Sequence, residues 1–110
     1  MRVYISGKMT GLKNYREVFQ KHEDLLRSWG YTDIVNPVHL SDKIIEKYNM
    51  TEEESFRPEN AKIFLTEDLR VLLDCDILYL IPNWHTSKGA NLEKHVAERI
   101  GKLILFGKED

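Results

Sequence analysis

The chain has 110 residues, 42% of them hydrophobic, and a net charge of −2, which is typical of one globular domain with a single core. Acidic and basic residues are mixed along the whole chain, so no basic stripe favours duplex nucleic acid as a partner. No apolar run approaches membrane-spanning length, and no long apolar signal-peptide core opens the chain. We therefore expect one cytoplasmic domain, residues 1–110, without a membrane or duplex nucleic acid as partner.

The first third of the chain predicts a strand, a helix and a second strand. Residues 3–5 form a short apolar strand that Ser6 and Gly7 stop. Asn14 and Glu17 have the spacing of a capping box at the start of a helix that Gly30 ends. Helical spacing places Val18, Phe19, His22, Leu25, Leu26 and Trp29 on one face. Residues 34–35 then form a brief strand, which Asn36 and Pro37 close.

The middle of the chain, residues 38–59, has the weakest pattern. A short helix is predicted within residues 39–48, and the polar, acidic residues 51–59 are predicted to be a loop or lid. Two interpretations stay open for residues 44–58: a lid or loop insertion over a site, or an oligomer contact.

The last half of the chain has clear periodicity. The apolar stripe of Ile63, Phe64, Leu65, Leu69, Leu72 and Leu73 predicts a helix over residues 60–73. Residues 77–81 are continuously apolar, as in a strand buried on both faces. A third helix is predicted over residues 87–100, with Leu92, Val96, Ala97 and Ile100 facing inward and Gly101 ending it. Residues 103–106 form the last strand.

This order of elements predicts a fold of the α/β class. We expect a doubly wound, Rossmann- or flavodoxin-like, mostly parallel sheet of about four to five strands with helices on both faces. Ligands of such sheets bind outside the carboxyl ends of the strands. Those ends lie at Ser6 and Gly7, at Asn36 and Pro37, and within residues 82–89.

Two carboxylates are candidates for chemistry at that edge. Glu93 lies in the second turn of a helix that Ser87 is placed to cap, where the helix dipole favours the ionised form that suits a nucleophile. Gly89 would allow a ligand to approach the backbone, and Ser87 could donate to a phosphate or hydroxyl. Pattern alone slightly favours ordinary helix-cap chemistry for this stretch.

The second carboxylate, Asp68, falls at the border of the apolar face of its helix, whereas Glu67 and Arg70 point outward. A salt bridge or a partly solvated edge position is the ordinary interpretation of a lone aspartate. Together, Asp68 and Glu93 match the pair of carboxylates that glycosyl chemistry uses, one trapping the anomeric carbon and the other handling protons.

Other residue types offer less specific signals. The glycine-rich stretch YISGKMTG could bind a phosphate or ribose through its backbone, with Lys8 adding positive charge, or be a simple tight turn. Trp84 could stack on a base or belong to the core, and His39 is interpreted as a surface histidine. Cys75, the only cysteine, lies between two aspartates and is interpreted as a small buried residue. Aspartates and histidines show no metal-ligand spacing, so we expect neither metal nor cofactor.

Four motifs resemble the nucleoside 2-deoxyribosyltransferase-like superfamily. They are YISGKMTG, VNP, EDLRVLLDCDILYLIPNW and SKGANLEKHVAERIGK, and they leave residues 38–58 outside the match. The chain looks most like the small DUF4406-type branch, whose members are often encoded by phages. The superfamily includes deoxyribosyltransferases and deoxynucleoside 5′-monophosphate N-glycosidases.

The resemblance implies roles for particular residues. It places the family's nucleophilic glutamate at Glu93 and the second acid, which assists proton transfer, at Asp68. It places Ser87 at a substrate phosphate, whereas transferases acting on free nucleosides carry an acid there. Substrate-binding residues are expected at Tyr4, Ser6, Gly7, Lys8, Met9, Trp84, Ser87 and Gly89. It also implies a homodimer or larger homo-oligomer, in which a neighbouring subunit completes the pocket.

Three functions stay open on the sequence. The first is hydrolysis or transfer at the N-glycosidic bond of (deoxy)nucleoside 5′-monophosphates or nucleosides, with Glu93 as nucleophile. The second is a non-catalytic module that binds or sequesters a nucleotide-derived ligand, because the fold alone does not decide function. The third is a phage accessory protein that binds a host protein and needs no pocket.

Overall fold

The computed structural model describes residues 1–108, so the last two residues of the predicted domain lie outside the described part. Within it, four strands form one parallel sheet in the order β2-β1-β3-β4. The strands are β1 (Arg2–Ser6), β2 (Asp33–Val35), β3 (Ile77–Leu80) and β4 (Leu103–Phe106). The predicted single α/β domain with a mostly parallel, Rossmann- or flavodoxin-like sheet is confirmed.

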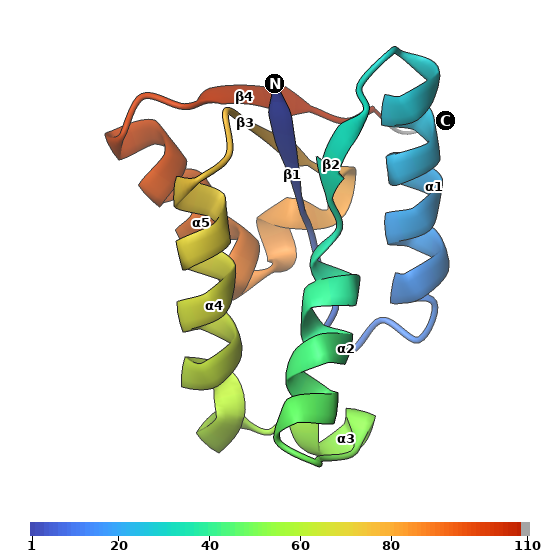
Figure 1. Ribbon diagram of the computed structural model, residues 1–110, viewed down its shortest axis with the longest axis vertical. Coiled ribbons are helices and arrows are strands. Elements are labelled where there is room, and N and C mark those ends of the chain that lie inside the picture. Colours follow the sequence, from blue (N-terminus) through green and yellow to red (C-terminus); the bar gives the residue numbers. More distant parts are fainter. Residues whose placement is uncertain (109–110) are drawn as a thin grey trace.

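Helices cover both faces of this sheet (Figure 1). The helix α1 (Tyr15–Ser28) packs on one face, and α4 (Ala61–Leu73) and α5 (Lys88–Arg99) pack on the other. The helix α2 (Pro37–Lys47) lies beside α4 and leads into the short helix α3 (Glu52–Ser55). Two 3₁₀ turns, η1 (Pro58–Asn60) and η2 (Pro82–Thr86), precede α4 and α5 respectively.

The alternation of side chains along β1 divides the core into two layers. Val3 and Ile5 belong to the layer under α1, with Phe19 and Leu26, whereas Tyr4 belongs to the layer under α4 and α5. Because successive side chains of a strand point to opposite faces, Ser6 points to the same side as Tyr4. The central strand β3 is buried along its whole length, as the apolar run predicts.

The sequence patterns are wrong at several helix ends. Asn14 is the N-cap residue of α1, but its side chain makes no cap hydrogen bond, so the predicted capping box with Glu17 is absent. Trp29 is 55% exposed because it follows the last turn of α1, and Leu92 and Ile100 of the α5 region are also exposed. In contrast, Gly30 and Gly101 adopt positive φ and end their helices as predicted.

Residues 51–59 are more regular than a loop. Thr51 and Glu54 form a complete capping box that begins α3, a pairing that the acidic composition of the segment obscured. The 3₁₀ turn η1 follows and joins α3 to α4. The predicted helix within residues 39–48 begins earlier, at Pro37, because Asn36 caps it through the backbone N–H of Val38.

Candidate active site

A cavity of about 370 Å³ opens at the carboxyl edge of the sheet. Its walls come from the loop after β1, from α2, from α3 and the residues after it, from α4, and from the first turns of α5. In the order β2-β1-β3-β4 the strand after β1 is added on one side of it and β3 on the other, so the strand order reverses between β1 and β3. Ligands of open α/β sheets bind outside such a switch point. The cavity size suits a small organic ligand.

Glu93 is held at the inner wall of this cavity. Its side chain is 7% exposed, and its Oε1 accepts a hydrogen bond of 2.6 Å from the Ser6 hydroxyl. Burial raises the Glu93 pKa to about 7, and the Ser6 hydrogen bond acts in the opposite direction. Burial therefore opposes the helix dipole, which favours the ionised form of Glu93, and shifts the pKa further than the dipole does.

Asp68 reaches the same cavity from α4. Its Oδ1 is buried and has no hydrogen-bond partner among residues 1–108. Burial, and then the nearby charge of Glu93, raise the Asp68 pKa to about 8. Asp68 is therefore mostly protonated at neutral pH, whereas Glu93 is close to half ionised. The ordinary alternative, a salt bridge at Asp68, is not formed within the described chain; the neighbouring Glu67 pairs with Arg70 instead.

Tyr4 adds a third oxygen to this group. Its side chain is fully buried, it lines the cavity, and its hydroxyl forms no hydrogen bond of normal geometry within residues 1–108. Burial and the charges of Glu93 and Asp68 raise the Tyr4 pKa well above its usual value, so the hydroxyl stays protonated. The Tyr4 hydroxyl nevertheless acts on Glu93 as a hydrogen-bond donor does and, with Ser6, lowers the Glu93 pKa against the effect of burial. Buried polar atoms are normally satisfied, so Asp68 Oδ1 is the buried atom beside the cavity that is left for a polar ligand.

The loop after β1 lies close to the β3 end. A Cβ at position 7 would lie 2.9 Å from the Ile81 side chain and 3.0 Å from Asn83 Oδ1, so the site requires glycine. Gly7 and Met9 line the cavity, as expected for substrate-binding residues. Lys8 does not line it; its backbone N–H donates to Asn83 Oδ1 at 2.9 Å.

The remaining predicted site residues divide between the cavity and the core. Ser87 and Gly89 line the cavity, and the Ser87 hydroxyl accepts the Ala90 N–H as the cap of α5. Ser6 contacts Glu93 and is not itself part of the cavity wall. Trp84 packs against Phe106 in the core under α5, with the Lys94 ammonium 5.4 Å from its ring, and lies outside the cavity wall.

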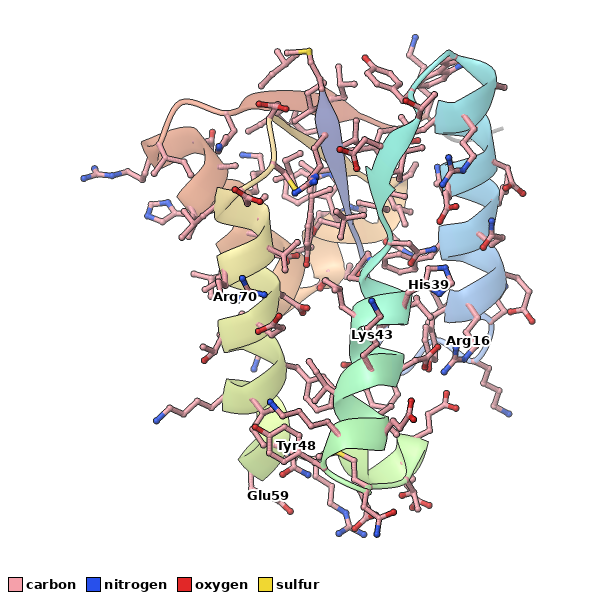
Figure 2. All side chains as sticks on the ribbon, viewed as in Figure 1. Arg16, His39, Lys43, Tyr48, Glu59 and Arg70 are labelled. Carbon is pink, nitrogen blue, oxygen red and sulfur yellow. The ribbon has the colours of Figure 1, made fainter. Side chains whose placement is uncertain are left out.

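His39 and Cys75 are placed as the sequence indicates. His39 is exposed and lies between α2 and α1, with its Nε2 3.9 Å from Glu23 (Figure 2). Cys75 is buried, and burial raises the pKa of its thiol to about 11. In the described part of the chain no cluster of three or more His, Cys, Asp or Glu side chains is placed to hold a metal ion. No helix among residues 1–108 is long and apolar enough to cross a membrane.

Sequence reasoning left open that residues 44–58 form a lid over a site, but it named no residue of the cavity wall that residues 41–65 supply. Ser41 and Ile45 reach the cavity from α2, and Phe64 and Leu65 reach it from α4. Ser55, Phe56 and Arg57 contribute from α3 and the turn after it. Phe64 and Leu65 belong to the apolar stripe of the predicted helix, whereas Phe56 and Arg57 stand alone in an acidic stretch, without a periodic pattern to identify them.

Of three comparisons with known proteins, the one with family models gives a match. The model of a domain of unknown function, DUF4406, matches residues 1–106. No curated protein and no solved structure matches the chain.

Proposed function

From the premise that the chain belongs to the DUF4406 family, we propose that it cleaves or exchanges the N-glycosidic bond of a nucleoside 5′-monophosphate or nucleoside, with Glu93 as nucleophile. The observation that carries the proposal is the pair of carboxyl groups at one cavity, buried Glu93 and half-buried Asp68, whose Oδ1 is buried. Enzymes that cleave glycosidic bonds use such a pair, one as nucleophile and the other as proton donor. Whether the chain forms a homodimer or larger oligomer stays a prediction.

The two carboxyl groups have environments suited to different roles. Ser6 donates to one oxygen of Glu93, and both Ser6 and Tyr4 stabilise its charge, which suits a carboxylate that attacks the anomeric carbon. Asp68 is the group with the higher pKa, about 8, and has no basic partner, so it can hold a proton at neutral pH. Pairs of titratable groups with separated pKa values are typical of acid–base sites.

The proposed reaction has two steps. An oxygen of Glu93 forms a bond to C1′ while the bond from C1′ to the base nitrogen breaks, and the base leaves with the proton of Asp68. Asp68, now ionised, then takes a proton from water as the water oxygen attacks C1′ and releases the Glu93 carboxylate. A second base in place of water would give transfer instead of hydrolysis.

The test is a chromatographic screen for free base. Purified protein is incubated with each ribo- and deoxyribonucleoside, and with each 5′-monophosphate, with and without a second base. We expect release by the wild-type chain, and a loss of at least about a hundredfold in Glu93→Gln and in Asp68→Asn. Glu98→Gln, an exposed carboxylate on the same helix as Glu93, is the matched control and should keep full activity.

The pH dependence of the reaction gives a second criterion. Glu93 must be ionised and Asp68 protonated, so the rate should rise with pH through about 7 and fall through about 8. A narrow maximum between these values supports the assignment. A rate that is flat from pH 6 to 9, or unaffected by either substitution, contradicts it.

One observation favours a second function, a non-catalytic nucleotide-binding module. Both carboxyl groups have raised pKa values, and a protonated carboxyl group is a good hydrogen-bond partner for a sugar hydroxyl. Such a module would bind a nucleotide without releasing base, and Glu93→Gln would bind it as tightly as the wild type. Thermal melting with each nucleotide, run beside the screen, separates the two functions.

A further inference from the structure

The cavity wall formed by residues 51–60 is an ordered part of the site. The Tyr15 hydroxyl of α1 donates to Glu52 Oε1 at 2.5 Å, and Arg16 lies 3.7 Å from the other oxygen of Glu52. The capping box of Thr51 and Glu54 begins α3, and the Asn60 side chain donates to the Glu54 carbonyl at 2.8 Å. These bonds join the segment to α1 and to itself, so its side chains reach the cavity from a fixed backbone.

Aromatic side chains make up much of this wall. The rings of Tyr15 and Phe56 meet edge to face, with centroids 5.6 Å apart and planes at 80°. Both rings line the cavity, but Tyr15 is buried whereas Phe56 is 37% exposed, so Phe56 has more ring surface left for a ligand. Phe64 lines the same cavity from α4. Every nucleobase has a flat face that can stack on such a ring.

The polar groups at this end of the cavity, from α2 and from residues 51–60, differ in which nucleobases they can select. Ser41 and Ser55 have hydroxyl groups, which both donate and accept and so accommodate any base edge. Arg57 has five N–H donors and no acceptor. Within residues 1–108 its ion pair is with Glu54, at a long distance of 3.8 Å, and more than half of its side chain is exposed, which leaves donors available to a ligand. Arg57 is therefore the group that can discriminate between bases.

We propose that Phe56 and Arg57 form a base subsite that prefers oxo bases, such as guanine, hypoxanthine, thymine and uracil, over the amino bases adenine and cytosine. The proposal rests on the proposed function only in placing the sugar at Glu93 and Asp68. With the sugar there, the base must occupy another part of the cavity, and this wall supplies its stacking surface. Oxo bases present a carbonyl oxygen to a donor, whereas adenine and cytosine present an amino donor at the same position.

The experiment measures binding of free bases, because binding does not require cleavage. Uracil and cytosine form one matched pair, and hypoxanthine and adenine form another, since the members of each differ in an oxo or an amino group. Affinities for the wild type and variants are measured by ligand-observed NMR titration. We expect the wild type to bind the oxo member of each pair about tenfold more tightly.

Two variants and two controls assign the preference to residues. In Arg57→Ala the affinities for the two members of each pair should become equal. Because Arg57 is exposed, the variant should keep its fold. Phe56→Ala should weaken all four bases by about tenfold and leave deoxyribose 5-phosphate binding unchanged. Tyr48→Ala, an exposed aromatic after α2, and Arg70→Ala, an exposed arginine of α4, are matched controls outside the cavity (Figure 2).

The outcomes separate this proposal from the proposed function. Equal affinities within both pairs for the wild type, or a preference that survives Arg57→Ala, overturn the base subsite. The base subsite is also overturned if Phe56→Ala weakens the binding of deoxyribose 5-phosphate as much as the binding of the free bases. Selective base binding without base release in the cleavage screen supports the subsite and contradicts only the glycosidase. Base release from every nucleotide at equal rates, without selective binding, contradicts only the subsite.

Discussion

At the residue scale, the chemistry of the site depends on a competition at Glu93. The helix dipole near the start of α5 favours the charged form, but such effects amount to about 0.3–1 kcal/mol. Burying a carboxylate costs more than this unless it is paired, and no cation pairs with Glu93 within residues 1–108. The Ser6 hydroxyl recovers part of that cost by donating at 2.6 Å. The group therefore titrates near neutral pH, where a small change in its surroundings alters its charge.

Ser6→Ala tests that balance directly. Because the Ser6 hydrogen bond lowers the Glu93 pKa, its loss should raise that pKa above the present value of about 7. The acidic limb of any activity profile would move to higher pH with it. The measurement is an NMR titration of ¹³C-labelled glutamate carboxyl groups, which needs no turnover. The control is Ser28→Ala, because the Ser28 hydroxyl donates to the Leu25 carbonyl and not to Glu93. This variant should leave the Glu93 titration unchanged. An unchanged Glu93 pKa in Ser6→Ala would show that the Ser6 hydroxyl does not stabilise the Glu93 carboxylate.

At the element scale, a side-chain cap begins some helices of this fold and not others. Asn36 caps α2: its side-chain oxygen accepts from the Val38 N–H at 3.0 Å, and its amide donates to the buried Glu23 at 3.2 Å. Asn14 occupies the same position at the start of α1 but makes no cap hydrogen bond. The two asparagines look alike in the sequence, and only their environments distinguish them.

This difference predicts unequal costs for one substitution. Asn36→Ala removes a helix cap and leaves the buried Glu23 without one donor, so we expect it to lower the free energy of unfolding by about 2 kcal/mol. Asn14→Ala removes no such bond and should cost less than about 0.5 kcal/mol. Denaturant unfolding of both variants measures the comparison. Equal costs would mean that the Asn36 bonds add nothing to the stability of α2.

At the scale of the whole molecule, the buried carboxyl groups connect the site to the stability of the fold. Asp68 titrates near 8 and Glu93 near 7 in the folded chain, against ordinary values of 3.8 and 4.5. Between about pH 4 and pH 8 the folded chain therefore holds more protons than the unfolded chain. The stabilising effect of these protons is complete below about pH 4 and is lost as the pH rises towards 8.

Asp68→Asn should remove much of this pH dependence. The wild-type chain is expected to lose stability, on the order of a few kcal/mol, as the pH rises from about 4 to about 8. The variant should lose distinctly less, because its amide does not ionise. Urea unfolding at pH values across this range gives the two curves. Parallel curves for the two chains would show that Asp68 does not titrate in this window. Bound nucleotide, in either proposed function, should raise the stability further.

The sequence by itself determined the class of fold. Apolar runs with a period suited to strands or helices, and glycines at helix ends, identified the four strands and the helices α1, α4 and α5, because these signals are local. Glu93 was selected by its position in the second turn after the Ser87 cap, and Asp68 by its position at the border of an apolar stripe, although the ordinary interpretation was favoured for each residue alone. The family motifs added a reason to place the two acids at one site.

Only the tertiary structure decided how these groups act. Burial of Glu93 and Asp68 depends on strands and helices far apart in the chain, so neither their pKa values nor the Ser6 contact is encoded in a local pattern. The wall of Phe56 and Arg57 depends on Tyr15 of α1, about forty residues earlier, holding Glu52 of α3. Trp84 and Lys8 were assigned to the ligand by residue type, and packing placed them elsewhere. Residue type indicates which chemistry is available, and three-dimensional proximity decides which residues perform it.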